Sequence, residues 1–282
     1  MRARAALLAA AVLGLTGAVL VAAFEWRRQA HADDNLRQRV SHRVVAGTGT
    51  RIACATLLQQ QPVVLLVLGQ SNAGNHGTSA SAGAAVAVIG DDGACYHSGD
   101  PLPGATGIGA SIWSRLPAAL AAAGVARPAV FAVLAVDASS VQEWTQARSP
   151  LPALLKATVQ RAMGLNLAPT LVLWQQGESD ALLGTAAGNY QQGLATLATR
   201  LQAVGVAAPI VLARSTVCRN TPSATLRAAI GQLVASDSRF RLGPDTDDLV
   251  GATERSDGCH FGDSGLQAAA ERWASSIAPL LR

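Results

Sequence analysis

The sequence has few charged and few aromatic residues, which make up 14% and 4% of its 282 residues. It also lacks the motifs that hold metals or nucleotides, because there is no H-E-x-x-H, no clustered Cys/His spacing, no G-x-G-x-x-G that opens a helix and no G-x-x-x-x-G-K-[ST] loop. We therefore expect no metal and no organic cofactor.

Most of the chain has no excess of basic over acidic residues. Residues 1–43 hold seven arginines and three acidic residues, which accounts for the whole net charge of +4 and leaves the remaining residues balanced. A nucleic-acid role needs a basic face on the folded domain, so we expect no nucleic-acid partner.

The N-terminus contains an uncharged apolar run at residues 5–24, which is long enough to cross a bilayer. Arg2 and Arg4 precede it, and Trp26 with two following arginines suits the interfacial end of a spanning helix. These features favour a membrane anchor. The alternative is an exported protein cut after Ala30-His31-Ala32.

Four cysteines form an even set without a C-x-x-C pair, a pattern typical of disulfides in an extracytoplasmic compartment. Of the three pairings, we favour Cys54 with Cys95 and Cys218 with Cys259, because Cys218 follows a predicted strand and Cys259 lies beside a candidate catalytic loop. Four buried free thiols are the alternative.

The chain divides into an anchor or signal segment at residues 1–32, a linker with one short leading strand at residues 33–61, and one domain at residues 62–282. Within the domain, apolar runs at residues 62–68, 129–136, 170–175 and 209–213 have the length of buried strands. Helical patterns occupy residues 111–123, 151–165, 186–204, 221–236 and 263–281. This alternation predicts an α/β domain with a parallel sheet covered on both faces, and we expect a monomer.

Ligands bind at the carboxyl ends of the strands in such sheets. Ser71 lies there, in the turn Gly69-Gln70-Ser71-Asn72 after the first apolar run. A serine nucleophile needs a histidine base that an acid orients. Strand-end serines more often satisfy backbone groups, so Ser71 alone is weak support for catalysis.

The segment Asp257-Gly258-Cys259-His260 supplies an acid three residues before a histidine on one loop. Asp257 can hold the Nδ1–H of His260 and leave Nε2 facing the serine. His76 and His97 have no such acid, and although each can line a cleft, we expect both to be solvated loop histidines.

Together, Gly69-Gln70-Ser71-Asn72, Trp174-Gln175-Gln176-Gly177-Glu178-Ser179-Asp180 and Asp257-x-x-His260-Phe261 resemble the sialate O-acetylesterase-like branch of the SGNH hydrolases. The resemblance implies a three-layer α/β/α sandwich with a five-stranded parallel, flavodoxin-like sheet. It also implies Ser71 as nucleophile, Asp257 and His260 as the acid-base pair, and an oxyanion hole built from Ser71 N–H, a glycine-loop N–H and the Gln176 amide.

Two segments depart from that family's pattern. The glycine loop reads Gly107-Ile108-Gly109-Ala110, so we choose Gly109 as the donor, with Ala110 as the alternative. The stretch 137–144 looks like the family's glycine-serine segment ending in tryptophan, with Asp137 and Ala138 in unusual places.

Three further residues have open roles in the candidate site. Glu178 is a supporting acid, a helix N-terminal residue or a direct partner of the catalytic loop, and we favour support. Asn72 is a support or substrate contact. Trp144, like Trp174, either stacks on a sugar or belongs to the core.

The resulting prediction is a serine esterase of the cell envelope that removes O-acetyl groups from carbohydrates. The alternatives are an O-acetyltransferase acting on an envelope polysaccharide and a non-catalytic glycan-binding module. An α/β-hydrolase is the rival fold, but its acid normally comes from a strand end well before the histidine.

Overall fold

The computed structural model describes residues 21, 24, 26–78, 83–219 and 222–282. The chain divides into two compact units, residues 1–38 and residues 39–282, and residues 26–38 of the first unit are helical. Within the described part of the chain, no helix has both the length and the apolar composition that a bilayer span requires. The predicted span at residues 5–24 lies outside the described residues except for positions 21 and 24. The predicted boundaries at residues 32 and 61 stay predictions.

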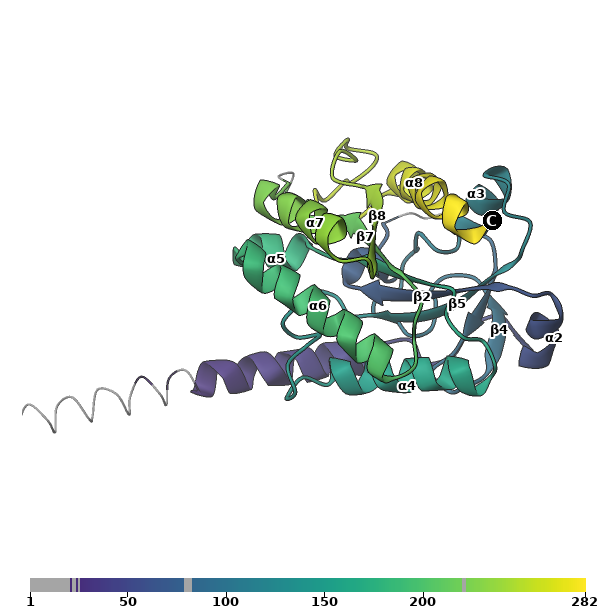
Figure 1. Ribbon diagram of the computed structural model, residues 1–282, viewed down its shortest axis with the longest axis horizontal. Helices are drawn as coiled ribbons and strands as arrows, with labels where there is room; N and C mark the ends of the chain where they lie inside the picture. The colour runs from purple at the N-terminus through teal and green to yellow at the C-terminus, as the bar shows by residue number, and fades with distance from the viewer. Residues whose placement is uncertain (1–20, 22–23, 25, 79–82, 220–221) are drawn as a thin grey trace, which may run out of the picture. The chain divides into compact units, whose positions relative to one another are not determined.

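The second unit contains one eight-stranded sheet in the order β1-β4-β3-β5-β2-β6-β7-β8 (Figure 1). Its strands are β1 (Thr50–Ile52), β2 (Val63–Gly69), β3 (Val86–Ile89), β4 (Cys95–Ser98), β5 (Ala129–Ala135), β6 (Leu171–Gln175), β7 (Ile210–Arg214) and β8 (Phe240–Asp245). Five neighbouring parallel strands, β5-β2-β6-β7-β8, have the chain order 2-1-3-4-5 of flavodoxin-like folds. The α/β fold class expected from the sequence is confirmed.

The expected count of five strands was too low, because three more strands extend the sheet beyond β5. β3 is parallel to β5, while β4 and β1 are antiparallel additions. β1 lies in the segment where one short leading strand was expected. β3 and β4 have only four residues each, so their hydrophobic pattern is too short to recognise in the sequence.

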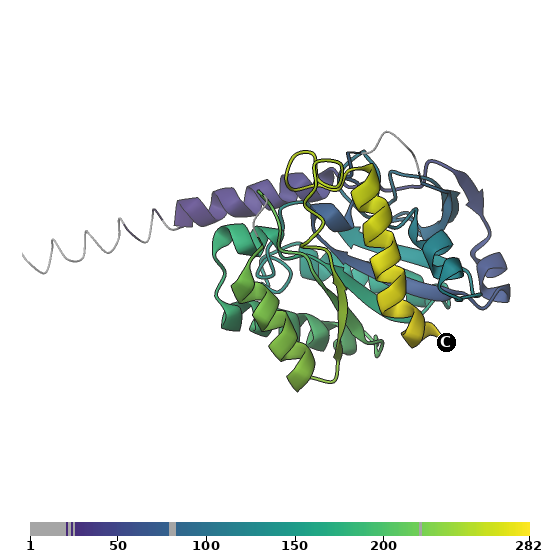
Figure 2. The same ribbon diagram turned by 90° about the horizontal axis from the view of Figure 1, so that it is seen from above.

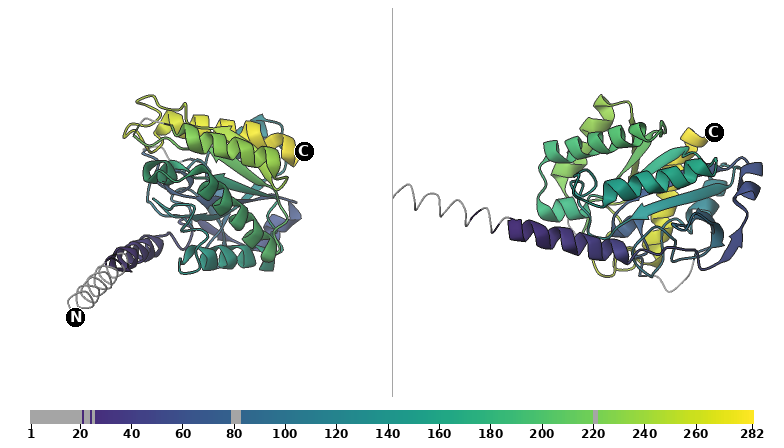
Figure 3. Two further views of the ribbon diagram at one scale, coloured as in Figure 1. Left: turned by 60° about the vertical axis from the view of Figure 1, so that its left-hand side comes forward. Right: turned by 90° about the horizontal axis from the view of Figure 1, so that it is seen from below.

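Helices cover both faces of the sheet. They are α2 (Cys54–Gln59), α3 (Leu116–Ala122), α4 (Leu151–Gly164), α5 (Glu178–Leu183), α6 (Ala187–Ala203), α7 (Ala224–Ser236) and α8 (Asp263–Leu281), with a short 3₁₀ helix, η1 (Ser71–Ala73). The helices α3 and α8 pack together over one face, where α8 lies across the strands (Figure 2). On the opposite face α4 packs on β5, and α6 packs beside α7 (right-hand view of Figure 3).

Burial on both faces explains the unbroken apolar runs. In β2, Val63, Leu65 and Val67 point into the core shared with α3 and α8, while the alternate residues are also buried, on the other face. The helix expected at residues 111–123 begins only at Leu116. The preceding turn is occupied by Ser111 and Ser114, whose hydroxyls donate to the Asp100 carboxylate at 2.7 and 2.6 Å.

Two disulfides stabilise the second unit, and they are the two pairs that the sequence favoured, Cys54–Cys95 and Cys218–Cys259. The first joins the start of α2 to the start of β4. The second joins the segment after β7 to the loop before α8. Because disulfides persist in oxidising compartments, they indicate an extracytoplasmic protein.

Candidate active site

Ser71 stands at the point where the sheet reverses its strand order. β2 has β5 on one side and β6 on the other, and crevices open at such switch points. Gly69 ends β2 with φ +151°, and a Cβ there would lie 2.1 Å from the carbonyl oxygen of Gln175. Only glycine therefore lets β2 and β6 stay close while the chain turns into η1, whose first residue is Ser71.

Asp257 and His260 form a hydrogen-bonded pair on the loop before α8. Asp257 Oδ2 lies 2.7 Å from His260 Nδ1, and Asp257 Oδ1 accepts the backbone N–H groups of Cys259 and His260 at 2.8 and 2.7 Å. Partial burial favours a higher pKa for Asp257, but the hydrogen bonds from His260 and the backbone outweigh it and lower the pKa below its usual value. The carboxylate is thus ionised, its partner Nδ1 carries the proton, and Nε2 is left as a base.

Arg255 holds this loop through hydrogen bonds to backbone carbonyls. Its buried guanidinium donates to the carbonyls of Leu249 at 2.8 Å and Thr246 at 3.1 Å and to that of Cys259, and it lies 4.0 Å from the centre of the Phe261 ring. Burial lowers the pKa of Arg255. These hydrogen bonds hold the loop that carries Asp257 and His260 in place.

Glu178 and Asn72 connect the serine turn to the same loop. The Asn72 amide donates to Glu178 Oε1 at 2.7 Å and to the Cys259 carbonyl at 3.1 Å, and Ser215 Oγ also donates to Glu178 Oε1 at 2.7 Å. Glu178 is fully buried at the first position of α5, and burial raises its pKa against the opposing effect of Arg255. These contacts are those of a supporting group that reaches the loop of Asp257 and His260 through Asn72.

One pocket of about 230 Å³ brings Ser71 and His260 together, whereas Asp257, Gly109 and Gln176 are not among the residues that line it. Ser71 and His260 both line it, with His76, Asp137, Ala138 and the Cys218–Cys259 disulfide among the other walls. Within the described residues no hydrogen bond joins Ser71 to His260. Such contacts often tighten only when substrate is bound.

Two of the three expected oxyanion donors are already occupied, which corrects the sequence-based assignment. Gly109 N–H donates to the Asn75 carbonyl at 2.7 Å, and the alternative Ala110 N–H donates to Gly77 at 3.2 Å, because this loop forms a β-bridge with Gly77.

The Gln176 amide is also occupied. Its nitrogen donates to the Ser139 carbonyl at 3.1 Å and to Asp180 Oδ2 at 2.5 Å, and its oxygen accepts the Tyr190 hydroxyl at 3.0 Å. Gln176 is fully buried, so it holds the Ser139 backbone instead of facing the pocket.

Ala138 is a pocket residue that the sequence reasoning missed. Its φ is +51°, which orients its backbone in a way that side chains rarely allow. Neither its N–H nor that of Ser71 donates a hydrogen bond within the described residues. The neighbouring backbone is held by Gln176 at Ser139 and by Asp180 at Val141, where the N–H···Oδ2 distance is 2.8 Å. The sequence analysis noted Ala138 only as a departure from the family's pattern, and that departure is the signal from which its place in the pocket could have been predicted.

His76 is also placed differently from its expectation as a solvated histidine. Its ring stacks on that of His260 with 5.5 Å between centroids, and Nε2 lies 3.1 Å from Thr106 Oγ1. Burial lowers the pKa of His76; the Asp137 charge opposes this shift and His260 adds to it. His97 is exposed, as expected, but it lies on β4 and not on a loop.

Trp144 belongs to the core and is not a sugar platform. It is fully buried, packs edge-on against Trp174 at 5.3 Å between ring centroids, and donates from Nε1 to Ser139 Oγ at 3.0 Å. Trp174 is equally buried. The two indoles therefore stabilise the segment beneath the pocket.

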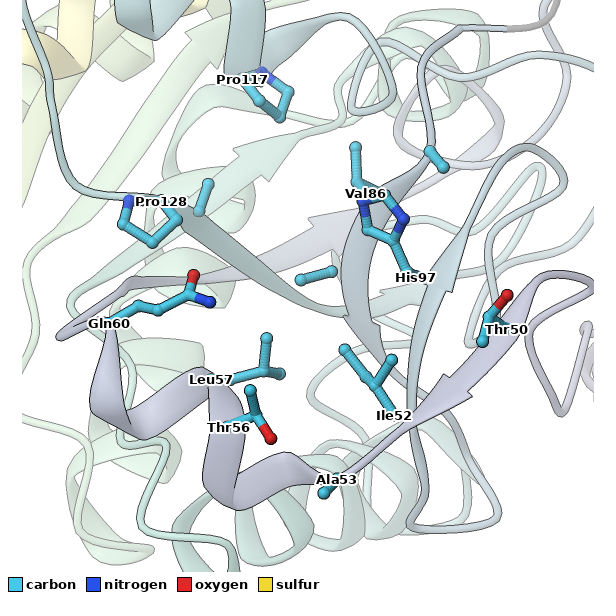
Figure 4. Close-up of a pocket in the computed structure, with 13 residues that line it drawn as sticks. Thr50, Ile52, Ala53, Thr56, Leu57, Gln60, Val86, His97, Pro117 and Pro128 are labelled. Atoms are coloured by element: carbon cyan, nitrogen blue, oxygen red, sulfur yellow. The ribbon is translucent and has the colours of Figure 1, made fainter.

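A larger pocket of about 680 Å³ lies elsewhere (Figure 4). Val86 and Ala129, which begin β3 and β5, line it together with α2 and His97, so it lies at the amino ends of these parallel strands. Ser71 follows the carboxyl end of β2, so it lies at the opposite ends of the strands from this pocket. In the described part of the chain, no group of three or more His, Cys, Asp or Glu residues is placed to hold a metal ion.

No family model and no curated protein matches this sequence. Solved structures do match, among them a protein from Arabidopsis thaliana, with 16% identity, a TM-score of 0.61, and coverage of 77% of this chain and 98% of the other. A carbohydrate esterase family 3 protein from Talaromyces cellulolyticus has 14% identity and a TM-score of 0.51, and the match covers 78% of this chain and 98% of the other. A family 3 carbohydrate esterase from Clostridium thermocellum has 15% identity, a TM-score of 0.50 and the same coverage. The chain therefore has the fold of these carbohydrate esterases, as its resemblance to the SGNH hydrolases predicted.

Proposed function

We propose that the protein is a serine esterase that removes O-acetyl groups from carbohydrates. The observation that carries this proposal is the small pocket at the switch point, which Ser71 lines together with a histidine whose Nδ1 is held by Asp257. Two neighbours in structure are carbohydrate esterases by name, which supports the ester class. A volume of about 230 Å³ lies below the ~300–1,000 Å³ of typical ligand pockets and suits a short acyl group.

In the proposed reaction, Ser71 Oγ attacks the acetyl carbonyl while His260 Nε2 takes its proton. Asp257 stabilises the imidazolium through Nδ1–H. The proton then passes to the leaving alcohol oxygen as its bond to the acetyl carbon breaks. Water, deprotonated by His260, attacks the acetyl-serine, and acetate leaves as Ser71 regains its proton.

We assign the oxyanion donors to the backbone N–H groups of Ser71 and Ala138. Both residues line the pocket, and these two N–H groups have no partner within the described residues. Donors of this kind act on charge that develops only in the transition state, and losing one typically costs ~10²–10³ in rate.

The direct test is acetate release by the full chain and by its Ser71→Ala variant. The substrates are p-nitrophenyl acetate, acetylated xylan and acetylated sialic acid. Release that disappears with Ser71→Ala supports the proposal, and the relative rates rank the substrates. Unchanged turnover in the variant, with folding verified by circular dichroism, would refute the nucleophile assignment. None of these observations favours an acetyltransferase or a binding module.

We further infer that residues 5–24 anchor a monomeric domain to a membrane on its extracytoplasmic side. The length of the apolar run and the two disulfides support this placement. Membrane fractionation combined with mass spectrometry of the N-terminus tests it. A soluble exported form that begins at Asp33 would show cleavage after Ala32 instead.

A further inference from the structure

His76 and Asp137 lie on one wall of the catalytic pocket, and the proposed acetyl transfer to Ser71 uses neither side chain. They come from different parts of the sheet edge, since His76 follows η1 and Asp137 follows β5. Thr106 joins them, because its Oγ1 accepts the Asp137 backbone N–H at 2.9 Å and lies 3.1 Å from His76 Nε2.

This network determines which nitrogen of His76 is free. Within the described residues, the Thr106 hydroxyl proton has no acceptor other than His76 Nε2, so Nε2 accepts it and the ring proton lies on Nδ1. The Cδ2 side of the ring lies close to Gly107, since a Cβ built on that glycine would lie 2.8 Å from His76 Cδ2. Nδ1–H has no protein partner there and is not among the fully buried unpaired atoms. Because His76 lines the pocket, we take this N–H as the donor available to a ligand there.

Asp137 provides an acceptor in the same pocket. The Asp137 backbone is held on both sides of its Cα atom. Its N–H donates to Thr106 Oγ1, and its carbonyl oxygen accepts a hydrogen bond from the Arg39 guanidinium. Its carboxylate forms no hydrogen bond within the described residues, while its charge acts on His76. An imidazole donor and a carboxylate acceptor therefore line the same pocket, and the His76 ring stacks on that of His260.

We propose that His76 and Asp137 form a subsite for a free hydroxyl group on the carbon next to the acetyl ester. A hydroxyl both donates and accepts, so it can give its proton to Asp137 and accept from His76 Nδ1–H. The preferred substrates are then partly acetylated vicinal diols, the class that includes partly acetylated sugars. This inference rests on the proposed esterase function and adds the specificity-determining residues.

Two acetates that differ in one hydroxyl test the subsite: trans-cyclohexane-1,2-diol monoacetate and cyclohexyl acetate. The full chain should show a kcat/KM about tenfold or more higher for the diol monoacetate, because sites built to bind a hydroxyl reject analogues that lack it. In His76→Phe and in Asp137→Asn, this ratio should fall towards one. His97→Phe changes a histidine outside the catalytic pocket and should leave the ratio unchanged.

A ratio near one in the unaltered protein would overturn the subsite while leaving esterase activity established. The subsite would also be overturned if both variants keep the full preference, or if His76→Phe lowers both rates in parallel, since His76 would then only support the His260 ring. No acetate release from either compound, or from p-nitrophenyl acetate, would refute the esterase function and the subsite with it. Circular dichroism of both variants confirms that the comparison is between folded proteins.

Discussion

Asp257→Asn is the substitution for which the structure predicts the most specific failure. Asp257 Oδ1 accepts two backbone N–H groups, from Cys259 and His260, while Oδ2 faces His260 Nδ1. An asparagine must keep its oxygen toward the two backbone donors, so its NH₂ group faces Nδ1. His260 then places its only ring proton on Nε2, which can no longer accept the proton of Ser71.

The size of the effect follows from the cost of reversing that amide. Turning the asparagine oxygen to Nδ1 leaves two backbone N–H groups opposite an NH₂ donor, at about 1–3 kcal/mol for each lost bond. The productive tautomer thus costs about 2–6 kcal/mol, which corresponds to a loss of roughly 30-fold to 10⁴-fold in rate. The fold should persist, because the variant keeps both backbone hydrogen bonds in its preferred orientation.

The assay is kcat/KM for p-nitrophenyl acetate, together with urea unfolding of the same preparation. Asp257→Ala is the matched control, because it removes both the orienting oxygen and the interfering NH₂ group. We expect Asp257→Asn to be folded and at least about 30-fold slower. Activity within about threefold of the unaltered enzyme would show that Asp257 does not set the tautomer of His260.

Three further outcomes are expected. Ala138→Gly should raise the free energy of unfolding by about 0.5–1 kcal/mol, because the relief of ~1–2 kcal/mol of left-handed strain exceeds the entropic cost of glycine. Ala138→Val should lower the free energy of unfolding. The reverse order of the two variants in urea unfolding would contradict the φ of +51°. Burial raises the pKa of Glu178 above its ordinary value of 4.5, so the folded state binds this proton more tightly than the unfolded state does. The stability of the folded state therefore falls as the pH rises from 4.5 through the folded pKa. In Glu178→Gln this loss is absent, and its Tm relative to the unaltered protein should increase from about pH 5 to about pH 8; a constant difference would count against the raised pKa. Each disulfide links residues 41 positions apart, so replacing either pair with alanine should lower the free energy of unfolding by the same amount, about 4 kcal/mol, through chain entropy. Only the loss of Cys218–Cys259 should also lower kcat/KM, measured under conditions where both variants are folded. Equal effects on activity would mean that this disulfide does not hold the catalytic loop.

Long apolar strands were the most predictable part of the fold. The runs that became β2, β5, β6 and β7 are buried on both faces, so their composition alone separates them from their surroundings. β8 escaped recognition because it lies at the sheet edge, mixes exposed and buried residues, and contains Gly243 and Pro244. The short α5 was not among the expected helices, although a helix N-terminal position was one interpretation of Glu178. Its first three residues belong to the motif that ends at Asp180, and six residues are too few for a helical pattern.

The acid-base pair was predictable for a different reason. Asp257 and His260 are three residues apart, so their contact depends on the local path of one loop. The disulfide partners also emerged from position along the chain. By contrast, the oxyanion donors depend on which N–H groups other parts of the chain leave free, and Gly109 is satisfied by Asn75, a residue 34 positions away in the sequence.

The sequence by itself therefore determined the α/β class, the turn that carries Ser71, the Asp-His pair and the cysteine framework, because each depends on residue type and short spacing. Tertiary structure alone decided which side chains share a pocket with Ser71. It buried Trp144 and Gln176, placed Ala138 beside Ser71 and stacked His76 on His260. The physical reason is that hydrogen-bonding capacity is shared among distant segments, and only their packing shows which groups remain free for a substrate.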